Sequence, residues 1–186
     1  ASFNNFHKIS DDTLDVWSKI LNSSNSQILL KNSISPGTVG EELRLNLLKK
    51  FITRGVEKNK ILFIDHKKNL QDHLSLYNNV DVALDTFPYP GVTTTFDAVL
   101  MGVPVLTMKG HNFNSRCGES ININLQMENF IAENKDDYFN KAISLQKEKS
   151  TLQTFGINLR EKVLKSSLFD IKDFTKSFEK IIQRII

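Results

Sequence analysis

Short apolar runs alternate along this chain with amphipathic stretches. The runs are QILLK at 27–31, ILFI at 61–64, VDVAL at 80–84, PVLTM at 104–108 and FIA at 130–132. Runs that are apolar at successive positions are typical of strands buried on both faces, as in parallel sheets. We therefore expect an α/β fold, an open parallel sheet with helices on both faces.

The stretches between these runs carry apolar residues at helical spacing. Ser10 is expected as the N-cap of a first helix, in which Leu14, Trp17 and Leu21 recur on one side. A break is expected at Ser-Pro-Gly, residues 35–37. Further helices are expected at 41–54, up to about 77, from about 94, and at 114–125, 135–147, 150–165 and 170–185.

The bulk composition indicates a soluble globular domain. Of 186 residues 40% are hydrophobic, and 24 basic against 21 acidic residues give a net charge of +3. The lysines are dispersed, so charge gives no indication of a nucleic-acid partner. No apolar run approaches the roughly 20 residues of a membrane span, so no membrane partner is expected.

Two further features bear on the context of the chain. Its one cysteine, Cys117, excludes an internal disulfide and fits a reducing compartment, so we expect a cytoplasmic protein. The chain opens at Ala1 with the strand-like ASFNNF and no lead-in. We therefore expect residues 1–186 to form a single domain of a longer protein.

The loop that follows the run at 80–84 has the composition of an anion site. Ligands of open α/β sheets bind beyond the carboxyl ends of the strands, where free N–H groups of helix N-termini suit phosphate. Pro88 and Pro90 stiffen this loop, and Gly91 permits a close approach of its backbone. Thr93 and Thr94 then bring hydroxyl and N–H groups to the start of a helix. The loop is a candidate diphosphate cradle.

Asp97, three residues after Thr94, has two interpretations. Its carboxylate can accept hydrogen bonds from ribose hydroxyls, as acidic residues do in nucleotide-binding folds. Thr94 and Asp97 also fit a variant capping box, in which the acid satisfies only the helix's own N–H groups. Neither a GxGxxG nor a P-loop sequence is present to decide between them.

Three polar residues outside this loop are weaker candidates. Asn5 and Lys8 follow the first expected strand, so Lys8 can meet a phosphate across the mouth of the sheet, or remain a solvated charge. His73 can donate to a ligand, or be a surface histidine. No metal site is expected, because His7, His66, His111 and Cys117 lack metal-ligand spacing.

Taken together, these segments resemble a known enzyme family. SFNNFHKIS, LQDHLSLYNNVDVALDTFPYPGVTTTFDAVLMGVPVLTMKG and SRCGESININL are similar, in order and spacing, to the C-terminal catalytic half of the O-linked N-acetylglucosamine transferase and SPINDLY-like family, glycosyltransferase family 41. The similarity runs from about Ser2 to the final helix.

The resemblance implies the C-terminal, Rossmann-like half of a GT-B glycosyltransferase. Such enzymes move a sugar, here most readily N-acetylglucosamine, from a nucleoside diphosphate to serine or threonine hydroxyls of proteins without a metal. A UDP-sugar is the expected donor, ahead of a GDP-sugar, and no cofactor is needed. Tetratricopeptide repeats and an N-terminal catalytic domain are expected upstream. The helix at 170–186 is expected to pack on that missing domain.

The resemblance also assigns roles by position. Lys8 is the one catalytic residue expected here, because it matches the family lysine that contacts the donor's diphosphate, and Asn5 faces the same ligand. Thr93 and Thr94 hold phosphate, Asp97 binds the ribose, and the helix of His73 lies against the nucleotide. The base that activates the acceptor is expected outside this chain, which alone is expected to bind donor weakly and transfer nothing.

Two departures leave alternatives open. Leu76 replaces an arginine of animal members, and Val92 stands where they have histidine, so the base of the nucleotide is not assigned. A non-catalytic nucleotide-binding or scaffold module is one alternative. Another GT-B enzyme acting on small molecules is a second.

Overall fold

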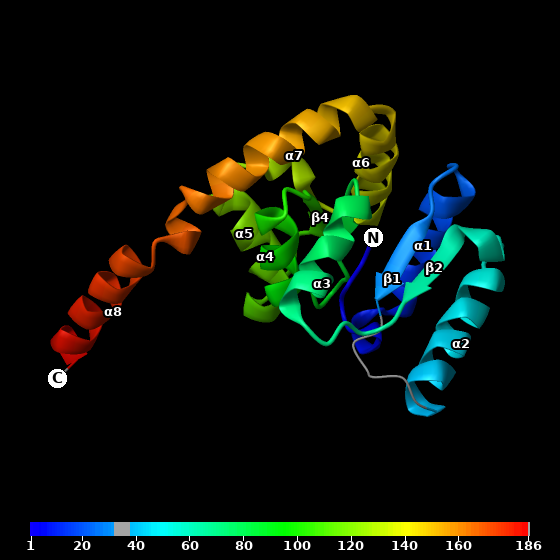
Figure 1. Ribbon diagram of the computed structural model, residues 1–186, viewed down its shortest axis with the longest axis horizontal. Coiled ribbons are helices and arrows are strands. Elements are labelled where there is room, and N and C mark those ends of the chain that lie inside the picture. Colours follow the sequence, from blue (N-terminus) through cyan, green and yellow to red (C-terminus); the bar gives the residue numbers. More distant parts are fainter. Residues whose placement is uncertain (32–37, 186) are drawn as a thin grey trace.

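The computed structural model describes residues 1–31 and 38–185, and the break expected at 35–37 lies outside them. Its elements alternate along the chain as expected (Figure 1). The strands are β1 (Ile28–Lys31), β2 (Ile61–Ile64), β3 (Ala83–Leu84), β4 (Val105–Met108) and β5 (Ile131–Ala132). The helices are α1 (Asp11–Asn22), α2 (Thr38–Ile52), α3 (Leu70–Ser75), α4 (Thr93–Leu100), α5 (Cys117–Asn124), α6 (Lys135–Lys147), α7 (Lys149–Leu164) and α8 (Ile171–Ile185).

The described strands pair in parallel, and the first residues of the chain join them into one sheet. β1 pairs with β2, and β4 pairs with both β3 and β5. Between β1 and β3 lies the segment Ala1–Ser2: the Ser2 N–H donates to the Leu29 oxygen, and the Leu84 N–H donates to the Ala1 oxygen. Counting this segment as the first strand gives the order 3-2-1-4-5-6 of doubly wound nucleotide-binding folds.

Two apolar cores lie on the two faces of this sheet. Neighbouring residues of a strand pack into different cores, because successive side chains of a strand point to opposite faces of the sheet. Leu30 and Leu106 belong to a core with α1, α2 and α6, whereas their neighbours Leu29 and Val105 face one with α4, α5 and α7. The expected α/β fold with helices on both faces is therefore confirmed.

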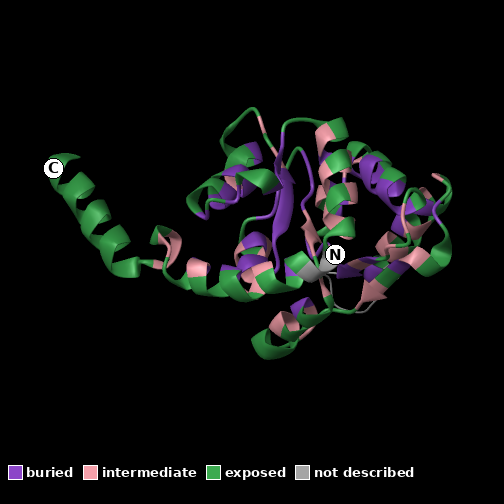
Figure 2. Cartoon of the chain, turned by 90° about the horizontal axis from the view of Figure 1, so that it is seen from above, coloured by how far each residue is buried: buried purple, intermediate pink, exposed green. Residues whose placement is uncertain are grey.

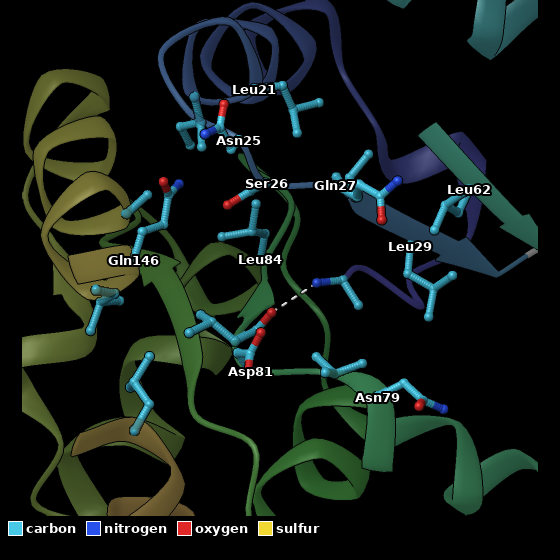
Figure 3. Close-up of a pocket in the computed structure, with 18 of the residues that line it drawn as sticks. Leu21, Asn25, Ser26, Gln27, Leu29, Leu62, Asn79, Asp81, Leu84 and Gln146 are labelled. Carbon is cyan, nitrogen blue, oxygen red and sulfur yellow. Dashed lines mark hydrogen bonds between the residues drawn. The ribbon is translucent and has the colours of Figure 1, made fainter. Parts of the chain in front are cut away.

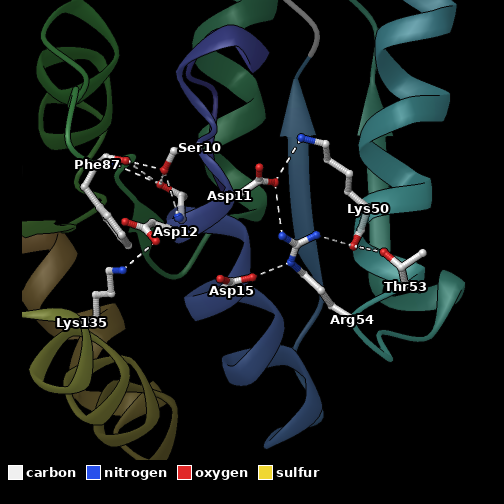
Figure 4. Close-up of polar contacts among 10 residues, drawn as sticks. Ser10, Asp11, Asp12, Asp15, Lys50, Thr53, Arg54, Phe87 and Lys135 are labelled. Atoms are coloured by element: carbon white, nitrogen blue, oxygen red, sulfur yellow. Dashed lines mark hydrogen bonds and ion pairs between the residues drawn. The ribbon is translucent and has the colours of Figure 1, made fainter.

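The helices α1 and α2 are joined at their surface by ion pairs (Figure 4). Arg54 Nε lies 2.6 Å from Asp15 Oδ1, and Asp11 Oδ1 accepts from Lys50 Nζ at 3.1 Å and from Arg54 at 3.2 Å. The bond from Lys50 lowers the pKa of Asp11 below its usual value. Exposed pairs of this kind stabilise a fold only slightly.

The helix α8 differs from the rest of the chain. It projects from the body at the end of α7 (Figure 1), and Figure 2 shows it exposed along its length. It buries no residue, although Phe174, Phe178, Ile181 and Ile185 form one apolar side. Among the described residues, no helix is both long and apolar enough to cross a membrane.

Candidate functional site

The order of strands reverses between the Ala1–Ser2 segment and β3. Ligands of doubly wound sheets bind at such a switch point, beyond the carboxyl ends of the strands. The loop after Ala1–Ser2 carries Asn4, Asn5 and Lys8, and the loop after β3 runs from Asp85 to Gly91 into α4. The loops that the sequence singled out therefore meet at the switch point.

Asp85 connects these loops, and the sequence interpretation missed it. The residue is fully buried, and its Oδ1 accepts from the Gly91 N–H at 2.6 Å and from Asn4 Nδ2 at 3.1 Å. The N–H of Thr86 donates to the same oxygen, and the Thr107 hydroxyl donates to Oδ2 at 2.9 Å. Burial raises the pKa of Asp85 to about 6, against the opposing effect of these donors. Asp85 therefore shapes the loop from inside.

The proline-containing loop is also fastened to the N-terminus of α1. Ser10 caps α1 as expected, and both its hydroxyl and that of Thr13 donate to the Phe87 oxygen, at 2.7 and 2.8 Å (Figure 4). On the outer side, Lys8 Nζ donates to the Pro90 oxygen at 3.0 Å and lies 4.2 Å from the centre of the Tyr89 ring. The loop thus holds the Lys8 ammonium at the mouth of the sheet.

The helix α4 begins at Thr93 without a side-chain cap. Its N-cap residue is Val92, and the Thr94 hydroxyl donates to Asn4 Oδ1 at 2.9 Å instead of to the helix. Tyr77 secures this end by donating to the Thr94 oxygen. The first N–H groups of a helix have no partner within it, so this end of α4 suits an anion.

Asp97 contacts a different helix from its own. Its Oδ2 lies 3.2 Å from His73 Nε2, and His73 Nδ1 lies 2.9 Å from Lys31 Nζ. The capping interpretation of Thr94 and Asp97 is therefore wrong. Lys31, at the carboxyl end of β1, is a second residue that sequence reasoning missed, although a polar residue ending a buried strand was the available signal.

The remaining candidates lie at the same edge with different partners. Asn5 is exposed, and its oxygen accepts from the His7 N–H, so it caps the short turn that contains Lys8. Thr93 is exposed at the first position of α4. The structure therefore brings Lys8, Thr93, Thr94, His73 and Asp97 to one edge, with Asn5 at its rim.

A separate hollow of about 660 Å³ lies near the amino ends of β1 and β3 (Figure 3). Gln27, Leu29, Leu62, Asn79 and Asp81 are among its lining residues. None of its described lining residues is a lysine, arginine or histidine. A diphosphate is held most strongly by cationic donors, so the carboxyl edge, which carries Lys8, remains the candidate site.

The part of the chain that the structure describes holds no group of three or more His, Cys, Asp or Glu residues able to bind a metal ion. The donors gathered at the carboxyl edge are ammonium, hydroxyl and N–H groups, with one carboxylate paired to histidine. That set suits an anionic ligand.

Comparison with known proteins identifies the family of this chain. The family model described as "Glycosyl transferase family 41" matches residues 1–178. This chain belongs to glycosyltransferase family 41. The tomato protein "Probable UDP-N-acetylglucosamine--peptide N-acetylglucosaminyltransferase SPINDLY" is 34% identical over 182 residues, which are 97% of this chain and 19% of the relative. A Caenorhabditis elegans UDP-N-acetylglucosamine--peptide N-acetylglucosaminyltransferase is 29% identical over 98% of this chain and 15% of its own length.

Solved structures of the family's fold are also similar. An O-GlcNAc transferase mutant of Thermobaculum terrenum superposes with a TM-score of 0.88 at 29% identity, over 98% of this chain and 35% of that one. Sucrose-phosphate synthase of Thermosynechococcus elongatus superposes with a TM-score of 0.66 at 15% identity, which shows the fold alone. The fold is that of GT-B glycosyltransferases, and the chain spans about a fifth of the length of the SPINDLY relative.

Proposed function

We propose that this chain is the donor-binding half of a metal-independent protein O-glycosyltransferase. Its donor is a UDP-sugar, with N-acetylglucosamine as the sugar, and its acceptors are serine or threonine hydroxyls of proteins. Family membership over residues 1–178 and the UDP-N-acetylglucosamine named for its relatives support this proposal.

One structural observation carries the proposal: an uncapped helix N-terminus, an ammonium and a part-exposed carboxylate share the switch-point edge. The diphosphate lies against the N–H groups of Thr93 and Thr94, beside Lys8, and the ribose hydroxyls donate to Asp97. Each of these groups has the charge or hydrogen-bonding sense that the corresponding part of a nucleoside diphosphate requires.

In the transfer step, the bond between the sugar's anomeric carbon and the diphosphate oxygen breaks, and its electron pair goes to the diphosphate. Lys8 and the end of α4 stabilise the charge that grows there, as preorganised groups do in electrostatic catalysis. The acceptor oxygen forms the new bond to the anomeric carbon. Its proton goes to a base outside this chain.

The partner of this half is a preceding catalytic domain, with tetratricopeptide repeats upstream for the protein acceptor. The large share of each relative that this chain does not cover supports this assignment. The exposed apolar side of α8, with Phe174 and Phe178, packs on that domain. Phe178→Glu is expected to weaken binding of a separately expressed preceding domain in pull-down, without lowering the melting temperature of this chain.

Calorimetric titration of the 186-residue chain with UDP and GDP tests the site. We expect weak binding of UDP, with Lys8→Ala and Asp97→Ala each weakening it about tenfold or more, because each removes a charged hydrogen-bonding group. Lys19→Ala and Asp136→Ala are matched controls, since they remove one lysine and one aspartate from an exposed ion pair, 3.6 Å apart, between α1 and α6.

Two outcomes contradict the proposal. If neither nucleotide binds at millimolar concentration, the chain is a scaffold or acts on another ligand. If UDP binds but both site variants bind like the controls, the nucleotide occupies a different surface.

A further inference from the structure

Both ring nitrogens of His73 are engaged inside the protein. Nδ1 lies 2.9 Å from Lys31 Nζ, and Nε2 lies 3.2 Å from Asp97 Oδ2. The His73 side chain is 13% exposed and that of Asp97 is 21% exposed. His73 is therefore a link between two charged groups from different elements.

The chemistry of the three groups fixes the direction of the hydrogen bonds. An ammonium has three donors and no acceptor, so with Lys31 protonated His73 Nδ1 must be the acceptor. The ring is then neutral, its proton lies on Nε2, and it donates to the Asp97 carboxylate. Burial and the Lys31 charge both lower the pKa of His73, which favours this neutral form.

The surroundings hold the ring in place. Phe3 and Tyr77 lie beside it, with ring centroids 6.2 and 5.8 Å away, and contact each other edge-on at 4.8 Å. Lys31 is itself 8% exposed, and burial lowers the pKa of its ammonium. A buried charge of this kind costs stability unless partners compensate for it, so its presence calls for a role other than stability.

We propose that Lys31 is a positioning residue of the donor site, which fixes the His73 proton on Nε2 and thereby aims the Asp97 carboxylate at the ligand. This inference rests on the proposed role of Asp97 in binding the ribose. His73 holds Oδ2 of Asp97, and no hydrogen bond to Oδ1 is found among the described residues. Oδ1 is the oxygen that receives the donor's hydroxyls.

The buried charge has a second effect. Lys31 places a positive charge behind a carboxylate that would otherwise repel an anionic nucleotide. Burial lowers the pKa of Lys31, and the nearby Asp97 charge opposes part of this shift by raising it. The Lys31–His73–Asp97 chain of contacts therefore lets the Asp97 carboxylate lie beside a diphosphate without a large cost in electrostatic repulsion.

Long-range ¹H–¹⁵N NMR of the 186-residue chain with ¹⁵N-labelled histidine measures the tautomer and the pKa of His73 directly. The chain has four histidines, and His73→Asn assigns the signal of interest. We expect His73 as the Nε2–H form at neutral pH, with a pKa below its usual value. Lys31→Met should raise this pKa, because it removes the Lys31 charge that lowers the pKa and keeps the Asp97 carboxylate that raises it. Tyr77 and His66 are the other titratable groups near His73.

Binding of UDP, measured on the same variants, separates a positioning role from a structural one. Lys31→Met is expected to weaken UDP binding about fivefold, the effect of one misdirected hydrogen bond, and Lys31→Arg to restore most of it. Lys165→Met, which removes an exposed lysine of the α7 end, should behave as wild type. Thermal unfolding checks that the variants are folded, and methionine is chosen because an apolar side chain of similar length suits this buried position.

The outcomes of the two measurements are distinct. An unchanged His73 tautomer, pKa and UDP affinity in Lys31→Met overturns the inference while leaving the proposed function intact. Failure of the wild type to bind UDP counts against the proposed function, and the NMR titration still decides whether Lys31 sets the state of His73.

Discussion

Asp85 and Asp97 lie at the same edge of the sheet but differ in burial and in hydrogen bonding. Asp85 is 1% exposed, and its two oxygens accept four hydrogen bonds from Asn4, Thr86, Gly91 and Thr107. Asp97 is partly exposed, and His73 engages one of its oxygens. Both oxygens of Asp85 are hydrogen-bonded inside the fold, whereas Asp97 has an oxygen with no described hydrogen bond, which the proposed function assigns to the ligand.

The difference separates two kinds of acid at the proposed nucleotide site. The inner acid fixes the loop from Phe87 to Gly91, so that the end of α4 and Lys8 have defined positions. The outer acid is bonded to a histidine, and in the proposed function it meets the ligand. Changes at the inner acid should therefore alter stability first, and changes at the outer acid should alter binding.

The largest effect is expected from Asp85→Ala. The change leaves four donors without their acceptor in the interior, which should lower the free energy of unfolding by about 3–5 kcal/mol. Urea unfolding followed by circular dichroism measures it. A loss below about 1 kcal/mol would mean that Asp85 does not organise the loop.

The pH dependence of stability is expected to identify Asp85 as well. Burial raises its pKa from 3.8 to about 6, so the folded state holds a proton that the unfolded state has released between these values. Stability contributed by this group is therefore present below about pH 4 and lost as the pH rises to about 6, by up to roughly 3 kcal/mol.

Urea unfolding at several pH values, for wild type and Asp85→Asn, measures this dependence. The asparagine variant lacks the titration, so the difference in unfolding free energy between the two should fall as the pH rises through the window. A difference that grows with pH would show that the four donated hydrogen bonds outweigh burial.

Gly91→Ala should have an intermediate effect. A Cβ at this position would lie 2.4 Å from Thr94 Oγ1 and 2.8 Å from Asn4 Oδ1, so those side chains must move. We expect a loss of about 1–3 kcal/mol in stability, typical of overpacking, and weaker UDP binding because the end of α4 shifts. Thermal unfolding and calorimetry measure the two, and wild-type values for both would contradict the close packing.

The sequence predicted the elements well and the contacts between them poorly. Buried runs such as ILFI at 61–64 and the cap at Ser10 are local signals, and the structure agrees with them. Asp85 and Lys31 were missed because their partners lie at positions that only the folded sheet brings close. Local pattern also made Asp97 a candidate cap, whereas its real partner, His73, comes from a different helix.

The smallest effect on stability is expected from Asp97→Ala. The side chain is partly exposed and has a single described hydrogen-bond partner, so the free energy of unfolding should fall by about 1 kcal/mol, the typical contribution of one hydrogen bond. Urea unfolding, on the protein used for the UDP titration, checks this. A loss as large as that of Asp85→Ala would erase the distinction between the two acids.

A crystal structure of the 186-residue chain with UDP tests the central claim most directly. We predict the diphosphate at the N–H groups of Thr93 and Thr94 and beside Lys8, with a ribose hydroxyl on Asp97. UDP lodged in the hollow lined by Gln27, Leu29 and Asp81, with the carboxyl edge empty, would contradict the account.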